Sequence, residues 1–327
     1  MGDVAILVPV LNAIIKQNKN IKITVLTQKH FTPIFKDLQG VNIHFFDKKI
    51  HKGISGLFEL YKELKIYRFN SVADIHNVIR TKILKLFFFG TEFVKIDKGR
   101  KEKRALISKK SFHQLKTSAE RYADVFRKLG LKIDLSNPIF PEKQKLSNYI
   151  ISILKTSSTP TLIGIAPFAA HKSKMYGLDK IKLVIEALSL NYNIFLFGGK
   201  NEEKKLESFE TNKNIISLAG KLTFSEELNI ISNLDCMVSM DSGNAHLAAM
   251  YGVNVISIWG VTHPFAGFAP FNQPNDFCLL PNLNDYPKIP TSVYGNKYPK
   301  NYENAASSIP VDVIVDKVKS VLKTKID

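Results

Sequence analysis

Apolar runs of strand type alternate with segments of helical periodicity along the first 131 residues. Apolar side chains recur at helical spacing between Val4 and Ile15, and a run rich in β-branched residues follows at 21–27. The alternation continues without a long interruption, so we expect a βαβ series in this part of the chain. The predicted strands are 21–27, 41–46, 71–76 and 92–97, and the helices after the opening one are 30–38, 56–67, 78–90 and 117–131.

A second series begins after a connector. Residues 132–160 contain three prolines, and the string TSSTP at their end has the composition of a linker. Alternation in both halves predicts an α/β fold with two Rossmann-like domains, each built on a parallel sheet with helices on both faces. The predicted strands of the second series are 161–167, 192–199, 214–220, 236–240 and 253–260, and the helices are 177–190, 224–234, 244–252 and 311–325.

The two series define the expected domains. The chain has 327 residues, 45% of them hydrophobic, which is enough for two cores of ordinary size. We expect an N-terminal domain at 1–150, a C-terminal domain at 161–309, and a final helix within 310–327 that crosses back toward the N-terminal domain.

The chain begins at a point that the pattern places inside a strand–loop–helix unit. Gly2 and Asp3 lead directly into the first helix, where an acid faces the positive end of the helix dipole. A parallel sheet of this kind is built around a strand that feeds the first helix, yet only Met1 precedes Gly2. We therefore expect the first strand to be missing beside the strand at 21–27, and a form extended by roughly 8–12 residues to be the stable one.

The composition is strongly basic, with 46 Lys and Arg residues against 29 Asp and Glu and a net charge of +17. Such a balance suits anionic partners, which include nucleic acids, anionic lipids and phosphorylated substrates. Lysine is spread along the whole chain, and the densest run, 95–110, contains none of the aromatic residues that single-stranded nucleic acid stacks on. We therefore expect no nucleic-acid partner.

The sequence contains no run of 18 apolar residues and no basic start followed by an apolar signal segment. Cys236 and Cys278, the two cysteines, form neither a disulfide framework nor a metal-binding spacing. These features predict a protein of the reducing cytoplasm. We expect no metal site and no cofactor.

Two loops that follow predicted strands are candidate anion sites, because ligands of open α/β sheets bind beyond the carboxyl ends of the strands. In MVSMDSGNAHLAAMYG, a strand is followed by Asp241, Ser242 and Gly243, where free backbone amides at a helix start favour a phosphate. The structural alternative is an ordinary capped helix with His246 packed inward. Neither GxGxxG nor the P-loop motif is present, so the dinucleotide and P-loop classes are unsupported.

The second loop, IAPFAAHKSKMYG, places small residues and lysines after another strand. Lys172, Ser173 and Lys174 lie where compact positive charges neutralise a pyrophosphate, and the alternative is a solvated loop. Asp3 likewise has two interpretations, a helix cap or a general base that points into a cleft.

Three stretches resemble one known family. MDSGNAHLAAMYGVNVISIWGVTHPFAGFAP is similar to the C-terminal signature of glycosyltransferase family 9, the ADP-heptose:lipopolysaccharide heptosyltransferases. MGDVAILVPVL resembles the N-terminal motif of that family, and APFAAHKSKMYG its donor-phosphate loop. The resemblance implies the GT-B fold, in which two Rossmann-like domains face each other across a cleft, and an inverting transfer without a metal.

The resemblance also implies roles for individual residues. Asp3 matches the catalytic base, which takes the proton of the acceptor hydroxyl. Lys174 matches the lysine that holds the donor diphosphate, Glu202 is placed for the ribose and Leu222 for the adenine. The full donor-binding set is Lys172, Ser173, Lys174, Glu202, Leu222, Asp241, Ser242, Gly243 and His246.

The acceptor of the resembled family is an acidic core sugar attached to lipid A. The resemblance therefore implies an ADP-sugar donor, a lipid A-linked acceptor and an enzyme peripheral to the inner face of the inner membrane, where the anionic leaflet suits a basic domain. Candidate acceptor contacts are Arg80, Lys98, Arg100 and Arg104, and the alternative for each is a solvated charge.

Three alternatives stay open. The motifs do not read the sugar ring, so a family member that uses another nucleotide sugar fits them equally well. A truncated, inactive form follows from the expected missing strand. A nucleic-acid-binding protein is the most remote class, and it requires a clustered basic face with stacking aromatics.

Overall fold

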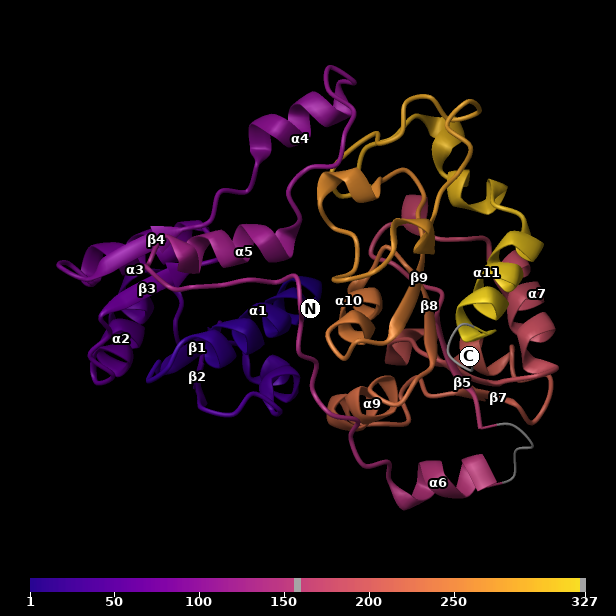
Figure 1. The fold of residues 1–327 in the computed structure, drawn as a ribbon, viewed down its shortest axis with the longest axis horizontal. Helices are drawn as coiled ribbons and strands as arrows, with labels where there is room; N and C mark the ends of the chain where they lie inside the picture. The colour runs from indigo at the N-terminus through magenta and orange to yellow at the C-terminus, as the bar shows by residue number, and fades with distance from the viewer. Residues whose placement is uncertain (156–159, 324–327) are drawn as a thin grey trace. The chain divides into compact units, whose positions relative to one another are not determined.

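A computed structural model describes residues 1–155 and 160–323 (Figure 1). Contacts divide the chain into two units. The N-terminal unit comprises Leu7–Arg100 and Lys116–Ile139, and the C-terminal unit comprises Met1–Ile6, Lys101–Leu115 and Phe140–Asp327. Part of the predicted linker, 156–159, and the end of the last predicted helix, 324–325, lie outside the described residues. Three stretches of the first 150 residues, 1–6, 101–115 and 140–150, thus belong to the C-terminal unit, and the functional boundary near 150 stays a prediction.

The C-terminal unit is built on one six-stranded sheet in the order β10-β9-β8-β5-β6-β7, and every pair in it is parallel. Its strands are nearly continuous apolar runs because helices cover both faces. The sheet predicted from the second series is therefore confirmed. The strands are β5 Leu162–Ala166, β6 Asn193–Leu196, β7 Ile215–Ser217, β8 Cys236–Met240, β9 Asn254–Ile258 and β10 Cys278–Leu279.

Helices α7 and α11 lie side by side on one face of this sheet, and α9 and α10 lie on the other (Figure 1). Sequence signals explain where they begin: α9 opens with a capping box in which Thr223 and Glu226 exchange hydrogen bonds. The helices are α7 Leu178–Ser189, α8 Glu203–Glu207, α9 Phe224–Ile231, α10 Gly243–Ala249 and α11 Val311–Lys323.

The N-terminal unit contains two separate pairs of parallel strands. β1, Ile23–Thr27, pairs with β2, Val41–Phe45, and β3, Ser71–Asp74, pairs with β4, Glu92–Lys95. Within the described residues, each of these strands has a partner on one side only. The sequence predicts the four strands correctly, but the structure has two short sheets where one continuous sheet was expected.

Helices α1, Gly2–Gln17, and α5, Ser118–Arg127, agree with the prediction. Helices α2, Gly53–Lys65, and α3, Ile79–Phe87, also agree, and their apolar faces bury Leu57, Leu60, Leu64 and Leu84 in one cluster.

Three helices were not expected, and one of them is the short α8 of the C-terminal unit. α4, Arg100–Ile107, forms from the dense basic run, and α6, Asn148–Lys155, forms inside the predicted connector. In these two, tertiary packing outweighs the charge or proline signals around the helix, since Leu106 of α4 and Ile150 of α6 are buried. No helix in the described ranges is long and apolar enough to cross a membrane.

Candidate functional site

The turn after β8 lies at the carboxyl edge of the C-terminal sheet. All five residues of β8 are buried, and the chain leaves the strand through Asp241 and Ser242 into α10. Ser242 holds the N-cap position, but its hydroxyl makes no cap hydrogen bond and lies 3.1 Å from the hydroxyl of Ser239 instead. The alternative of an ordinary side-chain cap at Ser242 therefore does not describe this turn.

Asp241 connects the two loops that the sequence singles out. Its Oδ2 accepts a hydrogen bond of 2.8 Å from the Thr262 hydroxyl and pairs with the Lys174 ammonium, also at 2.8 Å. The Lys174 and Asp241 side chains are only 14% and 10% exposed. A charge pair so far from water holds its geometry, so Asp241 fixes the direction of the Lys174 ammonium.

The loop that carries Lys174 is locked by its neighbours. Ser173 is fully buried, its hydroxyl donates to the Gly295 carbonyl at 2.5 Å, and its own carbonyl accepts from the Val261 amide at 3.1 Å. A Cβ on Gly260 would overlap that carbonyl oxygen, and a Cβ on Gly295 would lie 2.8 Å from the Lys174 stem. Two glycines thus let three loop segments meet around one lysine.

The N-terminus of the chain packs against the start of α10, within the same unit. A Cβ on Gly2 would lie 2.9 Å from Cδ2 of His246, and a Cβ on Gly243 would lie 2.6 Å from the Met1 methyl carbon. Asp3 follows in the first turn of α1, and it is exposed. Glycine at both positions is what allows this approach, so the structure brings Asp3 close to the predicted donor loop.

His246 is the buried centre of this arrangement. Its Nδ1 has no hydrogen-bond partner, and burial lowers its pKa, an effect that the charges of Asp241 and Asp3 oppose. The imidazole is therefore neutral near pH 7. The inward packing of His246 that the structural alternative required is confirmed, and the same packing places the ring among Lys174, Asp241 and Asp3.

The remaining predicted donor residues lie on neighbouring strand ends. Lys172 is exposed on the same short 3₁₀ turn as Lys174. Glu202 follows β6, and its Oε2 accepts a 2.6 Å hydrogen bond from the Gly199 amide. Leu222 precedes α9 and is half-buried. Their assignments to ribose and adenine stay predictions.

The four candidate acceptor contacts fall in different units. Arg80, Lys98 and Arg100 belong to the N-terminal unit, and Arg104 lies on α4 of the C-terminal unit. The guanidinium of Arg80 lies 4.9 Å from the Phe46 ring centre, and Arg100 and Arg104 are exposed. Their proposed role stays a prediction.

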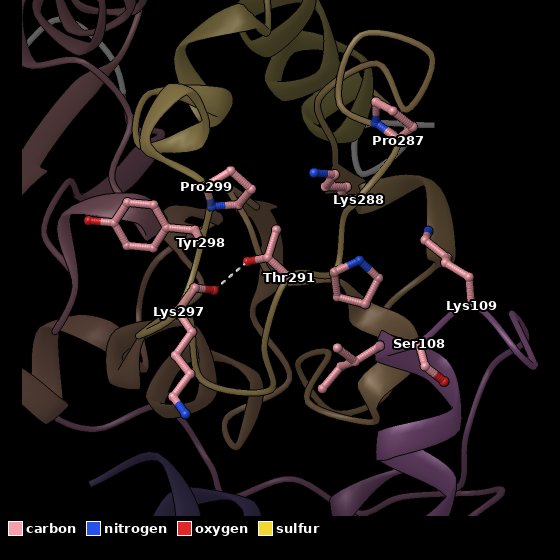
Figure 2. A pocket seen from close by; sticks show the side chains of 10 residues that line it. Ser108, Lys109, Pro287, Lys288, Thr291, Lys297, Tyr298 and Pro299 are labelled. Atoms are coloured by element: carbon pink, nitrogen blue, oxygen red, sulfur yellow. Dashed lines mark hydrogen bonds between the residues drawn. The ribbon is translucent and has the colours of Figure 1, made fainter.

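A pocket of about 410 Å³ lies next to the Lys174 loop but contains none of the predicted site residues. The end of α4 and the segment 287–299 line it, and the Lys288 ammonium points across it toward Pro299 (Figure 2). Thr291 joins the pocket wall to the site, because its amide donates to the Val261 carbonyl at 2.9 Å.

Sequence reasoning gave no roles to Thr262, Gly260 and Gly295. Thr262 and Gly260 follow β9, and the sequence feature that could have indicated them is the turn GVTHP after a buried strand. Gly295 lies about 120 residues beyond Ser173, and its signal is only YGN in a loop, where the positive φ of 80° favours glycine.

Comparison with known proteins identifies relatives along most of the chain. A family model described as glycosyltransferase family 9 (heptosyltransferase) matches residues 57–297. Lipopolysaccharide heptosyltransferase 3 of Escherichia coli is 24% identical over 281 residues, which are 80% of this chain and 81% of that protein.

Solved structures resemble the whole fold. A glycosyl transferase family 9 protein from Veillonella parvula matches with a TM-score of 0.76 and 19% identity, over 99% of this chain and 94% of the other. E. coli ADP-heptose lps heptosyltransferase II matches with a TM-score of 0.70 and 14% identity, over 100% and 97%. This likeness confirms the predicted α/β fold of the GT-B class.

Proposed function

The chain belongs to glycosyltransferase family 9, the heptosyltransferase family, and we propose that it transfers heptose from ADP-heptose to an inner-core sugar of lipopolysaccharide. The observation that carries the proposal is the buried Lys174–Asp241 pair at the carboxyl edge of the sheet. Asp3 lies close to that pair, because the charges of Asp3, Asp241 and Lys174 all affect the pKa of His246. A fixed cation and a nearby carboxylate are what a displacement at an anomeric carbon requires.

In this proposal Lys174 receives the donor diphosphate. The ammonium has three donors, so it can keep its bond to Asp241 while it donates to phosphate oxygens. The hydrogen bond from Thr262 keeps the Asp241 carboxylate in place throughout. The charge that develops on ADP as it leaves is then stabilised by a group that does not have to reorganise.

Asp3 acts as the general base. It takes the proton of the acceptor hydroxyl as that oxygen attacks the anomeric carbon, and ADP departs from the opposite face, so the configuration inverts. The neutral His246 ring packs against Gly2 without adding a positive charge that would neutralise Asp3.

The remaining parts of the proposal concern the acceptor and its surroundings. We propose that the N-terminal unit, with Arg80, Lys98 and Arg100, binds a lipid A-linked saccharide at the cytoplasmic face of the inner membrane, and that Arg104 contributes from α4. The net charge of +17 supports this, because both the acidic acceptor and the anionic leaflet attract a basic protein.

A transfer assay tests the function. The purified protein is incubated with a lipid A-linked inner-core acceptor and, in parallel, with ADP-heptose and a panel of other ADP-, UDP- and GDP-sugars. The mass of the acceptor and the release of nucleotide are measured, and samples without acceptor control for hydrolysis. We expect heptose addition from ADP-heptose; transfer of a different sugar only would replace the proposed donor, and no transfer from any would overturn the function.

A further inference from the structure

Half of the exposed large apolar side chains lie in one part of the N-terminal unit. Eighteen are exposed among the described residues, and nine of them lie between residues 45 and 89. On α3 and just beyond it, Ile79 and Leu86 are each 75% exposed and Phe89 is 97% exposed. Scattered apolar residues are ordinary on a surface, but a concentration of this kind marks an interaction site.

The exposed residues of α3 form one stripe. Ile79, Lys82 and Leu86 recur at intervals of three and four, so they share one face of the helix, and Phe89 follows just beyond its end. The opposite face is anchored, since Leu84 and Phe88 pack in a core cluster with leucines of α2. The stripe therefore stays exposed on a helix that is itself firmly packed.

Helix α2 extends the apolar area. The rings of Phe58 and Tyr61 lie 5.4 and 5.8 Å from the ring of Phe87, which joins the two helices. Ile54, one turn before Phe58 on the same side of α2, is 68% exposed. We call Ile54, Phe58, Ile79, Lys82, Lys85, Leu86 and Phe89 the α2–α3 face.

The charges within this face are positive. The segment 79–90 contains Arg80, Lys82 and Lys85 and no acidic residue. On α2, the ammonium of Lys62 lies 5.0 Å from the Phe58 ring centre while it also pairs with Glu59 at 2.9 Å. Amines set among exposed rings and aliphatic chains are typical of surfaces that lie in the head-group region of a bilayer.

We propose that the α2–α3 face binds the surface of an anionic lipid bilayer. Leu86 and Phe89 enter the boundary between head groups and acyl chains, and Lys82 and Lys85 contact lipid phosphates. A second copy of the chain is a poor occupant, because a two-fold contact through this face would bring two surfaces of the same positive charge together. The inference deepens the membrane partner in the proposed function and rests on it, but its test needs no turnover.

Vesicle flotation tests the proposal with the full chain. We expect the protein to bind vesicles of phosphatidylethanolamine and phosphatidylglycerol, to bind pure phosphatidylcholine vesicles weakly, and to release as salt rises. Lys82→Ala with Lys85→Ala should weaken binding roughly thirtyfold, since each lysine near an anionic surface contributes about a factor of five. Leu86→Ser with Phe89→Ser should weaken it at least about tenfold.

Matched variants of the other unit serve as controls. Leu190→Ser removes a leucine that is 79% exposed, and Lys205→Ala with Lys213→Ala removes two exposed lysines; none of these should change vesicle binding. The melting temperature of each variant verifies the fold, and transfer to a lipid-free acceptor separates this proposal from the proposed function. Equal vesicle binding by face variants and wild type, or a change in lipid-free oligomeric mass on substitution of the face, would overturn the proposal.

Discussion

Asp241 is an acidic residue in a loop that is predicted to bind an anion, the donor diphosphate. From the sequence, a carboxylate beside a diphosphate is a liability, because like charges repel. In the structure the Asp241 carboxylate accepts a hydrogen bond from Thr262 and pairs with Lys174, and so it orients that cation. The sequence singled out both residues, but their pairing depends on a contact between positions 67 residues apart, which no local pattern reveals.

Removing the Lys174 charge should weaken donor binding without destroying the fold. Lys174→Met keeps the aliphatic stem that packs against Gly295 and deletes only the ammonium. Loss of a charge-assisted contact of about 1.5–3 kcal/mol predicts a roughly ten- to hundredfold rise in the Kd for ADP, measured by calorimetry. Lys213→Met, at an exposed lysine outside the predicted donor-binding set, is the matched control, and an unchanged Kd for Lys174→Met contradicts the assignment.

Glu227 should make stability depend on pH. Burial raises its pKa from the ordinary 4.5 to about 7, so the folded protein holds a proton that the unfolded chain has lost. The stability that this shift contributes is fully present below about pH 4.5 and is lost as the pH rises through 7. The loss lowers the free energy of unfolding by about 1–3 kcal/mol. Glu227→Gln should therefore raise the free energy of unfolding in urea at pH 8 and leave it nearly unchanged at pH 4.5. An equal effect at both pH values would argue against a buried, protonated Glu227.

The loop after β5 meets the loop after β9 and the segment around Gly295 because Gly260 and Gly295 permit it, and the tightest contact is the one at Gly260. Gly260→Ala would drive a methyl group into the Ser173 carbonyl oxygen, and backbone cannot yield as a flexible side chain does. We expect a loss of about 2–4 kcal/mol in the free energy of unfolding together with weaker ADP binding.

The control for this substitution is Gly199→Ala. A Cβ there would meet only the Glu202 carboxylate, at 3.6 Å, which is an ordinary contact, and its φ of −73° suits any residue. Thermal and urea unfolding of both variants compare the two positions. Equal stability of Gly260→Ala and Gly199→Ala would show that the Ser173 loop is free to shift.

Helices and strands with strong periodicity were predictable, and mixed segments were not. The buried strand CMVSM followed by Asp-Ser-Gly predicted both β8 and the start of α10. The run at 95–110 was interpreted through its charge, although Arg100–Ile107 buries Lys103 and Leu106 as a helix does. Local patterns determine where an element can form, while tertiary packing decides between a charged coil and a charged helix.

Over the whole chain, alternation of strand and helix predicted the α/β class in both halves, and only the sheet of the second half formed as a continuous unit. In the first half the same alternation predicted four strands correctly, and these strands form two separate pairs in the structure. Pattern specifies which residues form strands, but strand order depends on pairing partners far apart in sequence, such as β5 with β8. No local pattern could predict that Met1 and Gly2 pack against the residues of α10 either.

Charge balance constrains the whole reaction. The diphosphate of ADP-heptose must be neutralised as it leaves, and the proposal gives this role to Lys174. In the described residues, no group of three or more His, Cys, Asp or Glu side chains is placed to hold a metal ion. We expect the transfer rate in excess EDTA to stay within about twofold of the untreated rate, a change of less than 1 kcal/mol in the barrier. Lys174→Met should stay impaired when Mg²⁺ or Mn²⁺ is added, because a free ion does not replace a cation fixed by Asp241. Complete loss of transfer on chelation, with recovery on adding either ion, would show instead that a metal carries the charge.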